Sequence, residues 1–278
     1  MKKILSIALA ALMLFTVVGM FASCGKKSDY KQIEEKGYFV CGITLYEPMN
    51  FFNEDDELTG FDTDFANAVA EKLGLQAKFQ VISWGSKYLE LNSGAIDCIW
   101  NGFTYGSETV KNAAGEEISV SRTDYVDFSY KYLANGQCVV TSTANLVTLN
   151  SKEAFAGKKG MAEGGSAGEE LAQELSTNYT ATDSQAKALI ELKNGTVDFI
   201  VIDSTMANAM VGKGDYAALS VNNAIPTEAE EYAIGFRKGS DFTAKVNEAI
   251  KELSADGTLA AIAAKYDLSS DLIANIGK

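Results

Sequence analysis

Residues 91–100 read LNSGAIDCIW, and residues 192–201, which lie 101 positions further along the chain, read LKNGTVDFIV. In each segment a helical stretch ends at a glycine suited to a left-handed C-cap, and an apolar run then predicts a buried strand. A single match of this kind can arise by chance. The repeat indicates two α/β lobes of related architecture.

Further predicted elements alternate in the same way. The pattern predicts strands at 39–44 and 76–82, and helices at 61–73, 184–194, 241–255 and 258–266. Strands separated by helices favour mostly parallel sheets with helices on their faces. Two polar, turn-rich stretches, 134–136 and 222–227, are the predicted crossings between the lobes.

The N-terminal segment has the features of an export signal. Lys2 and Lys3 precede an apolar run, 4–20, and the small residues Ala22 and Ser23 precede Cys24. This resembles a bacterial lipoprotein signal, which implies a signal at 1–23, acylation of Cys24 and a polar tether over 24–35. The protein is then held at the extracytoplasmic face of the membrane by its lipid. A plain signal peptide or an uncleaved signal anchor is the alternative.

Composition excludes several functions. The formal net charge of −13 makes the chain a poor partner for nucleic acid. Because histidine is absent, Ser-His-Asp and Cys-His nucleophiles and histidine-based zinc sites are excluded, and we predict no cofactor or metal. Cys41, Cys98 and Cys138 are odd in number and far apart, which favours buried free thiols over disulfides.

Polar residues follow both strands of the repeat, where ligands bind in open parallel sheets. The first strand leads into Asn101-Gly102-Phe103-Thr104 and the second into Asp203. Arg122 is one of only two arginines, and its planar fork of donors suits a carboxylate. One fixed cation and one fixed anion complement a zwitterion, with Arg122 facing an α-carboxylate and Asp203 an α-ammonium.

The chain resembles the amino-acid-binding proteins of ABC importers, a family of extracellular solute-binding proteins. The resemblance covers nearly all of the sequence after the signal, and its motifs come in the family's order: GFDTD at 60–64, DCIWNGFT at 97–104, Arg122 followed by VDFS at 126–129, GKKGMAEGGS at 157–166, VDFIVID at 197–203, EYAIGFRKG at 231–239, DGT at 256–258 and KY at 265–266.

The resemblance implies a two-lobed, periplasmic-binding-protein-like fold of type II that closes on its ligand like a hinge. Lobe 1 is expected to comprise 36–135 and 226–278, and lobe 2 to comprise 136–225, with two crossing segments between them. The implied ligand is a free amino acid and the implied partner an ABC permease. A dehydratase-like enzyme related to cyclohexadienyl dehydratase and an amino-acid-sensing receptor are the alternatives. We expect a monomer.

Site roles carry over by position. Arg122 takes the carboxylate and Asp203 the amine. Hydrogen bonds to the ligand are expected from Asn101, Gly102 and Thr104. Trp84 and Tyr46 are expected to form aromatic walls, and Ser166 with Ala167 to contact the ligand from the second lobe near its carboxylate.

Several of these residues have a simpler structural interpretation. Asp203 stands where it would cap the helix 204–210, and Ser166 has the capping-box spacing to Glu169. Trp84 also fits a core position, and Arg237 fits a solvated charge. Glu47 and Glu163 are expected at the rim of the cleft or in solvent.

The position of Arg122 departs from the family pattern. It comes 21 residues after Asn101, whereas the family arginine follows within about eight residues, near Thr109. The intervening residues, 106–121, are polar and predict an inserted surface loop. We expect Arg122 to return to the cleft after this loop.

Overall fold

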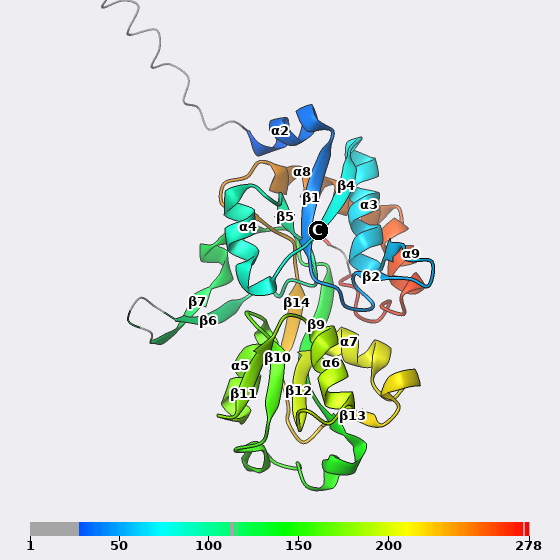
Figure 1. The fold of residues 1–278 in the computed structure, drawn as a ribbon. Coiled ribbons are helices and arrows are strands. Elements are labelled where there is room, and N and C mark those ends of the chain that lie inside the picture. Colours follow the sequence, from blue (N-terminus) through cyan, green and yellow to red (C-terminus); the bar gives the residue numbers. More distant parts are fainter. Residues whose placement is uncertain (1–27, 112–113, 115, 275, 278) are drawn as a thin grey trace, which may run out of the picture.

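The computed structural model describes residues 28–111, 114, 116–274 and 276–277, so the predicted signal and Cys24 lie outside the described residues. The chain forms two lobes, one above the other in Figure 1, each built on a sheet covered by helices. The predicted two-lobed α/β fold is confirmed. Among the described residues, no helix combines the length and apolar character needed to cross a bilayer.

The sheet of lobe 1 runs in the order β4, β1, β5, β15, β8. β1 is parallel to β4 and β5, whereas β15 is antiparallel to β5 and β8. The strands are β1 (Tyr38–Ile43), β4 (Gln76–Val81), β5 (Cys98–Ile99), β8 (Val126–Phe128) and β15 (Gly235–Arg237), with a small separate pair, β2 (Phe51–Phe52) and β3 (Leu58–Thr59). The helices are α2 (Asp29–Lys36), α3 (Phe61–Leu73), α4 (Lys87–Ser93), α8 (Phe242–Ala255) and α9 (Thr258–Lys265).

The sheet of lobe 2 runs in the order β11, β10, β12, β9, β13. β10 is parallel to β11 and β12, whereas β9 is antiparallel to β12 and β13. The strands are β9 (Leu133–Ser142), β10 (Gly160–Glu163), β11 (Tyr179–Thr182), β12 (Phe199–Asp203) and β13 (Leu219–Val221), and the helices are α5 (Ala167–Leu175), α6 (Gln185–Lys193) and α7 (Ser204–Met210). In each sheet a single strand runs against the others, β15 in lobe 1 and β9 in lobe 2, so the predicted mostly parallel sheets are confirmed.

The repeated segments adopt the predicted conformations. Gly94 follows α4 with φ 81° and Gly195 follows α6 with φ 71°, the left-handed region that glycine enters without a Cβ clash. The strands that follow are β5 and β12, and each pairs in parallel with an earlier strand of its own sheet. This repeat places the carboxyl ends of β5 and β12 at the edges of their lobes that face each other.

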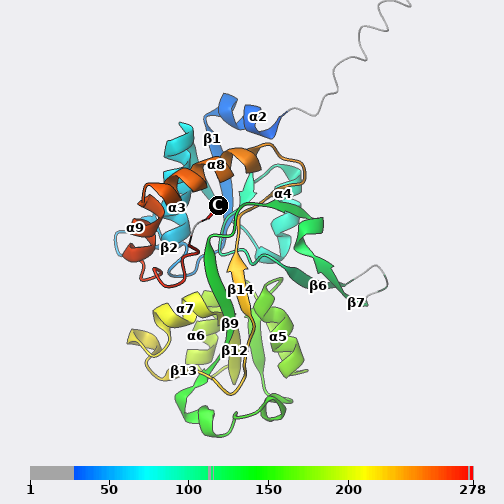
Figure 2. The same cartoon turned by 180° about the vertical axis from the view of Figure 1, so that it is seen from behind.

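The crossings are an antiparallel pair of strands. β14 (Ala229–Tyr232) pairs with the first residues of β9, from Ala229 opposite Gly136 to Tyr232 opposite Leu133, and Figure 2 shows the two running side by side between the lobes. The first predicted crossing, 134–136, lies in β9. The second, 222–227, is placed too early, because Asn222 is tied into lobe 2 by hydrogen bonds to the carbonyls of Val139 and Leu149.

The predicted tether over 24–35 is corrected by α2, which occupies 29–36. The Ser28 hydroxyl accepts from Lys31 N–H as an N-cap, and Ile33 is buried. Arg237 holds the helix through Asp29, with its Nε 2.8 Å from the carboxylate, and also bonds the carbonyls of Leu91 and Ile96. Arg237 is therefore a structural residue of lobe 1 and not the solvated charge that the sequence predicts.

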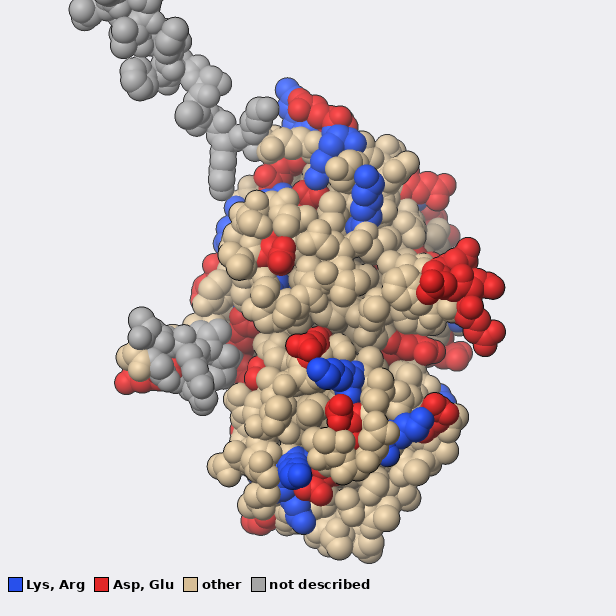
Figure 3. Space-filling view, viewed as in Figure 1, with Lys and Arg blue, Asp and Glu red and all other residues tan. Residues whose placement is uncertain are grey.

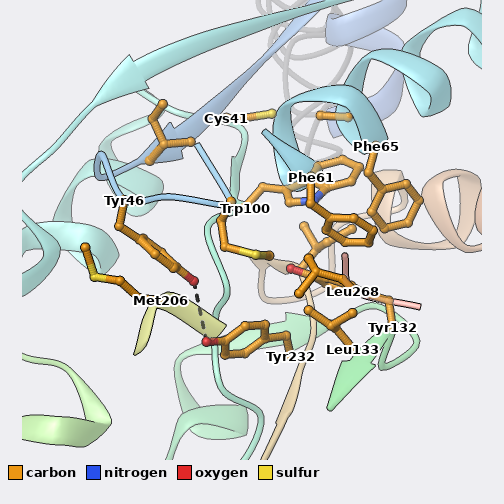
Figure 4. Packing of buried hydrophobic residues seen from close by; sticks show 14 of the residues in the cluster. Cys41, Tyr46, Phe61, Phe65, Trp100, Tyr132, Leu133, Met206, Tyr232 and Leu268 are labelled. Atoms are coloured by element: carbon orange, nitrogen blue, oxygen red, sulfur yellow. Dashed lines mark hydrogen bonds between the residues drawn. The ribbon is translucent and has the colours of Figure 1, made fainter. Parts of the chain in front are cut away.

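An aromatic cluster forms the centre of lobe 1 (Figure 4). Phe65 packs edge-on against Trp100 and Tyr132, with ring centroids 5.2 and 5.4 Å away. Each fully buried ring contributes roughly 1.5–3 kcal/mol relative to exposure. The cluster extends to Tyr46, which lines the cavity described below, and to Tyr232, whose hydroxyl lies 3.4 Å from that of Tyr46.

The stretch predicted as an inserted loop is a β-hairpin. β6 (Ser107–Lys111) pairs with β7 (Glu117–Ser121), and the hairpin projects from the side of lobe 1 in Figure 1. An isolated hairpin is only marginally stable. This one is anchored at its base, where Arg122 N–H donates to the Gly106 carbonyl at 2.9 Å and the side chain of Glu108 is buried.

Candidate functional site

A narrow cavity of about 10 Å³, roughly the room of one water molecule, lies between the lobes. It gathers all nine residues that the sequence singles out as ligand contacts, together with two that it does not. The lining residues are Tyr46, Trp84, Asn101, Gly102, Thr104 and Arg122 from lobe 1, and Glu163, Ser166, Ala167, Gln185 and Asp203 from lobe 2. Among the described residues, no group of three or more metal-ligating side chains is arranged to hold a metal ion.

Arg122 reaches the cavity from the end of the hairpin, as expected. Its side chain is buried, its Nε lies 3.2 Å from a Glu108 carboxylate oxygen, and its Nη1 donates to the Thr104 carbonyl at 2.7 Å. The guanidinium also lies 5.2 Å from the Phe103 ring centroid. Its Nη2 has no hydrogen-bond partner in the part of the chain that the structure describes. One end of the fork is therefore fixed and the other is free to meet an acceptor.

Glu108 joins two buried cations. One of its carboxylate oxygens lies 3.2 Å from Arg122 Nε and 3.4 Å from Lys87 Nζ. Burial lowers the pKa of Lys87 to about 8, and Glu108 opposes that shift. Lys87 Nζ also donates to the Gly165 carbonyl of lobe 2 at 3.0 Å. The hairpin therefore supplies the anion that allows two cations to be buried beside the cavity.

Asp203, the last residue of β12, is held by neutral amides. One carboxylate oxygen accepts from Gln137 at 2.7 Å and from Asn135 at 2.9 Å, and the other accepts from Gln185 at 2.5 Å. Burial raises the pKa of Asp203 above its usual value, while these hydrogen bonds oppose the rise. Asp203 occupies the N-cap position of α7 but makes no side-chain cap bond. Its carboxylate is directed to the amides and the cavity, so the capping interpretation does not describe it.

The segment Asn101 to Thr104 forms the floor of the lobe 1 side. The Asn101 amide is committed within the lobe, donating to Thr44 and Asn50 and accepting from Thr44. The Thr104 hydroxyl donates to Glu230 at 3.1 Å. In this structure the side chains of Asn101 and Thr104 therefore fix the conformation of this part of the cavity wall.

Gly102 is required by close packing. Its φ of 54° lies in the left-handed region, and a Cβ at this position would sit 1.9 Å from the Tyr46 hydroxyl. Its N–H donates to Asp62 at 2.7 Å. Burial raises the pKa of Asp62 to about 7, and the Gly102 bond opposes the rise.

The predicted aromatic walls are buried and line the cavity. Trp84 packs edge-on against Phe103, with centroids 5.5 Å apart, so it belongs both to a hydrophobic cluster and to the cavity wall. On lobe 2, the Ser166 hydroxyl accepts from Glu169 N–H at 3.2 Å and caps α5, and Ala167 begins that helix. Ser166 thus combines the two roles that its spacing allows.

Two further residues line the cavity: Gln185, which the sequence does not single out, and Glu163, which it places at the rim of the cleft or in solvent. Glu163 is only 3% exposed, and its Oε1 has no hydrogen-bond partner among the described residues. The rule that located Asp203 also applies to Glu163, since it is the last residue of the parallel strand β10. Glu47, the other carboxylate considered for the rim, is exposed.

The outer surface is acidic in places. Figure 3 shows red side chains gathered at the edge of lobe 1 over the loop between β2 and β3, where residues 54–57 are all acidic and exposed.

Two α/β lobes joined by paired crossing strands, with a polar cavity between them, define the class of two-lobed solute-binding proteins. The model of the bacterial extracellular solute-binding proteins, family 3, matches residues 39–269, and the chain belongs to this family. The predicted family is confirmed. Membership places the protein outside the cytoplasm.

Individual proteins of this kind are similar along most of their length. The L-cystine-binding protein TcyA of Bacillus subtilis is 30% identical, covering 96% of this chain and 97% of its own. An ABC uptake transporter substrate-binding protein from Streptococcus pneumoniae, solved with bound histidine, has a TM-score of 0.73 and 29% identity, covering 86% and 96%. The ancestral amino acid-binding protein AncCDT-1, a precursor of cyclohexadienyl dehydratase, has a TM-score of 0.72 and 26% identity, covering 86% and 99%. These relatives agree with the predicted function in amino-acid import and with the type II fold.

Proposed function

We propose that this protein binds a free amino acid between its lobes and delivers it to an ABC permease. The observation that carries the proposal is the free Nη2 of Arg122 in a buried cavity that also holds Asp203. The guanidinium meets the α-carboxylate and Asp203 meets the α-ammonium. Burying a zwitterion is tolerable only where each charge finds a partner, and this cavity offers one to each.

Closure of the lobes completes the site. Lys87 of lobe 1 bonds the Gly165 carbonyl of lobe 2, and a Cβ at Gly165 would lie 3.0 Å from the Cα of Gly85. The lobes thus touch beside the cavity in this structure. We place the hinge in the paired strands β9 and β14, where the chain crosses twice. A ligand that contacts both edges favours the closed state over the open one.

Membrane anchoring follows from the N-terminal sequence. Acylation of Cys24 tethers a monomer at the outer face of the membrane, within reach of the permease. Membrane fractionation of cells expressing Cys24→Ala tests this, because the variant is expected in the soluble or secreted fraction. Co-purification with a permease separates import from a purely sensory role.

Binding without turnover is the proposed activity. A dehydratase built on this fold would consume its ligand, whereas a binding protein returns it unchanged. Incubation with cyclohexadienyl acids such as prephenate, followed by chromatography, separates the two. Loss of substrate at a catalytic rate would replace the proposal with the enzymatic alternative.

A thermal-unfolding screen of residues 24–278 against the twenty amino acids tests the proposal directly. A ligand at a hundred times its Kd adds about 2.7 kcal/mol of stability. Arg122→Ala is expected to abolish this gain, and Arg122→Lys to restore little of it because lysine lacks the fork. Lys245→Ala, which removes an exposed cation of α8, is the control and should behave as wild type. If no amino acid stabilises the wild-type protein, the proposal fails.

A further inference from the structure

Glu163 is a buried carboxyl that the zwitterion site leaves unused. It ends β10, lines the cavity and is 3% exposed, yet its Oε1 has no partner among the described residues. A buried, unpaired polar atom is costly, and native proteins rarely retain one without a reason. Asp203, in contrast, has hydrogen bonds to both of its oxygens.

The cavity lining holds more acidic groups than basic ones. Arg122 is the only cation among the residues that line it in the described chain, whereas Glu163 and Asp203 are both acids. Lys87 is not among the lining residues, and its ammonium is held by Glu108 and the Gly165 carbonyl. A zwitterionic head group pairs with Arg122 and Asp203. One carboxyl, Glu163, then has no counterpart.

We propose that Glu163 binds a second cationic group of the ligand, so that the ligand is an amino acid with a basic side chain, such as lysine, ornithine or arginine. This inference rests on the proposed function. With such a ligand, one carboxylate and two cations meet one guanidinium and two carboxylates. A ligand with two complete zwitterionic heads, such as cystine, would bring a second carboxylate for which the cavity lining has no second cation.

The titration behaviour of Glu163 supports this geometry. Burial, and to a lesser extent Asp203, raises the pKa of Glu163 to about 8, while Thr44, Lys87 and Gln185 oppose the rise. Tyr46 and Arg122 also line the cavity around it. In the empty site the carboxyl therefore holds its proton at neutral pH. A cationic ligand group favours the carboxylate, so its binding releases a proton.

Isothermal titration calorimetry with matched ligand pairs tests the proposal. L-arginine is compared with L-citrulline, and L-lysine with L-norleucine, because each pair differs chiefly in the side-chain charge. The wild-type protein is expected to bind the charged member at least about thirtyfold more tightly, the effect of one buried charge pair. Equal affinity within each pair, or tightest binding of cystine, would overturn the inference.

Glu163→Gln assigns the preference to this residue. The variant keeps the shape and removes the charge, so arginine binding should weaken about thirtyfold or more while citrulline binding changes little. Glu47→Gln, which changes an exposed carboxylate, is the matched control and should bind as wild type. Retention of the full arginine preference in Glu163→Gln contradicts the assignment. Citrulline binding and the thermal unfolding of the variant show that it is folded.

Proton release gives an independent readout. Arginine titrations at pH 7 in buffers of different ionisation enthalpy should show release of up to one proton per site in wild type and markedly less in Glu163→Gln. Equal release in both would assign the proton to another group, such as Asp62, and count against Glu163. If no amino acid of any charge binds, the proposed function itself fails. If neutral amino acids bind as well as basic ones, only the Glu163 subsite fails.

Discussion

At the lobe 1 edge of the cavity, Arg122 and Lys87 share the one carboxylate of Glu108, so the lobe supplies an anion and keeps one positive charge for a ligand. At the lobe 2 edge, Asp203 is surrounded by the neutral amides of Gln137 and Gln185, and one oxygen of Glu163 has no hydrogen-bond partner within the described ranges. The cations of lobe 1 thus have an anionic partner before any ligand arrives. Lobe 2 holds acids whose pKa values are raised and which lack a cation.

The two edges of the cavity therefore have different roles in ligand binding. An arginine fixed at Nε and Nη1 is pre-organised, so little conformational freedom is lost when a carboxylate meets its Nη2. The acids of lobe 2 gain most from a ligand, because a cation relieves an unfavourable burial. We therefore expect changes in lobe 2 to alter ligand charge preference and pH dependence, and changes around Arg122 to alter affinity for the common head group.

The largest effect is expected for Asp203→Asn. Removing the carboxylate leaves the ligand ammonium buried without its anion, which should weaken binding by about 2–5 kcal/mol. Calorimetry against the best ligand measures this. Asp183→Asn, an exposed carboxylate of the same lobe, is the control. Unchanged affinity in Asp203→Asn would show that lobe 2 does not bind the ammonium through this residue.

Glu163→Gln should change the pH dependence of folding without ligand. The folded-state pKa of Glu163 is raised to about 8, so between about pH 4.5 and 8 the folded protein binds more protons than the unfolded chain, and stability from this group falls as pH rises. Urea unfolding measures this at pH 5 and pH 8. The free energy of unfolding of the variant, relative to wild type, should be higher at pH 8 than at pH 5 by an amount of the order of a few kcal/mol.

Because the pKa of Lys87 is lowered, its contribution to stability rises with pH, opposite to that of Glu163, and this change falls mainly above pH 8. A constant difference between the variant and wild type at pH 5 and pH 8 would mean that Glu163 is solvated in the open protein.

Arg237→Ala separates the two arginines. Arg237 donates hydrogen bonds to Asp29 of α2, to Asp97 and to two carbonyls, and it does not line the cavity. Its loss should therefore lower the free energy of unfolding by about 2 kcal/mol. Ligand affinity should stay within a few-fold of wild type. Urea unfolding and calorimetry measure the two quantities. Loss of ligand binding in the folded variant would show that Arg237 also contributes to binding and is not only a structural residue.

Glu108→Gln is expected to have the smallest effect on ligand affinity, although loss of the anion shared by Lys87 and Arg122 should lower the free energy of unfolding. The amide oxygen still accepts from Arg122 Nε and the Thr104 carbonyl still holds Nη1, so affinity should fall by only about 1 kcal/mol for all amino acids alike. The parallel fall for arginine and citrulline distinguishes this positioning role from that of Glu163. A change in charge preference would contradict the division between the lobes.

Much of the fold follows from local patterns. The helix that ends at Gly74 and the helix that Ser184 caps form where periodicity and capping chemistry predict them. The floor segment at Asn101 and the anion at Asp203 follow from the rule that ligands lie beyond the carboxyl ends of parallel strands. These signals are local, and each is complete within a short stretch of chain.

The misplaced features depend on distant partners. Residues 29–36 look like a polar tether, and become a helix of lobe 1 because Arg237, far along the chain, binds Asp29. The crossing pair moves to 229–232 because β14 needs β9 beside it. The sequence places Glu163 at the rim of the cleft or in solvent, because a carboxylate is usually exposed. Its burial depends on the packing of lobe 1 against lobe 2.

Local patterns in the sequence are enough to predict two α/β lobes, the family, and a cation and an anion near the strand ends, because capping, periodicity and the strand-end rule act over a few residues. Three features emerge from the folded chain alone: the hairpin that brings Arg122 to the cavity, the pairing of Glu108 with Lys87, and the Oε1 of Glu163 that has no hydrogen-bond partner among the described residues. Those facts depend on desolvation and charge pairing between segments that are distant in sequence, and no local pattern records them.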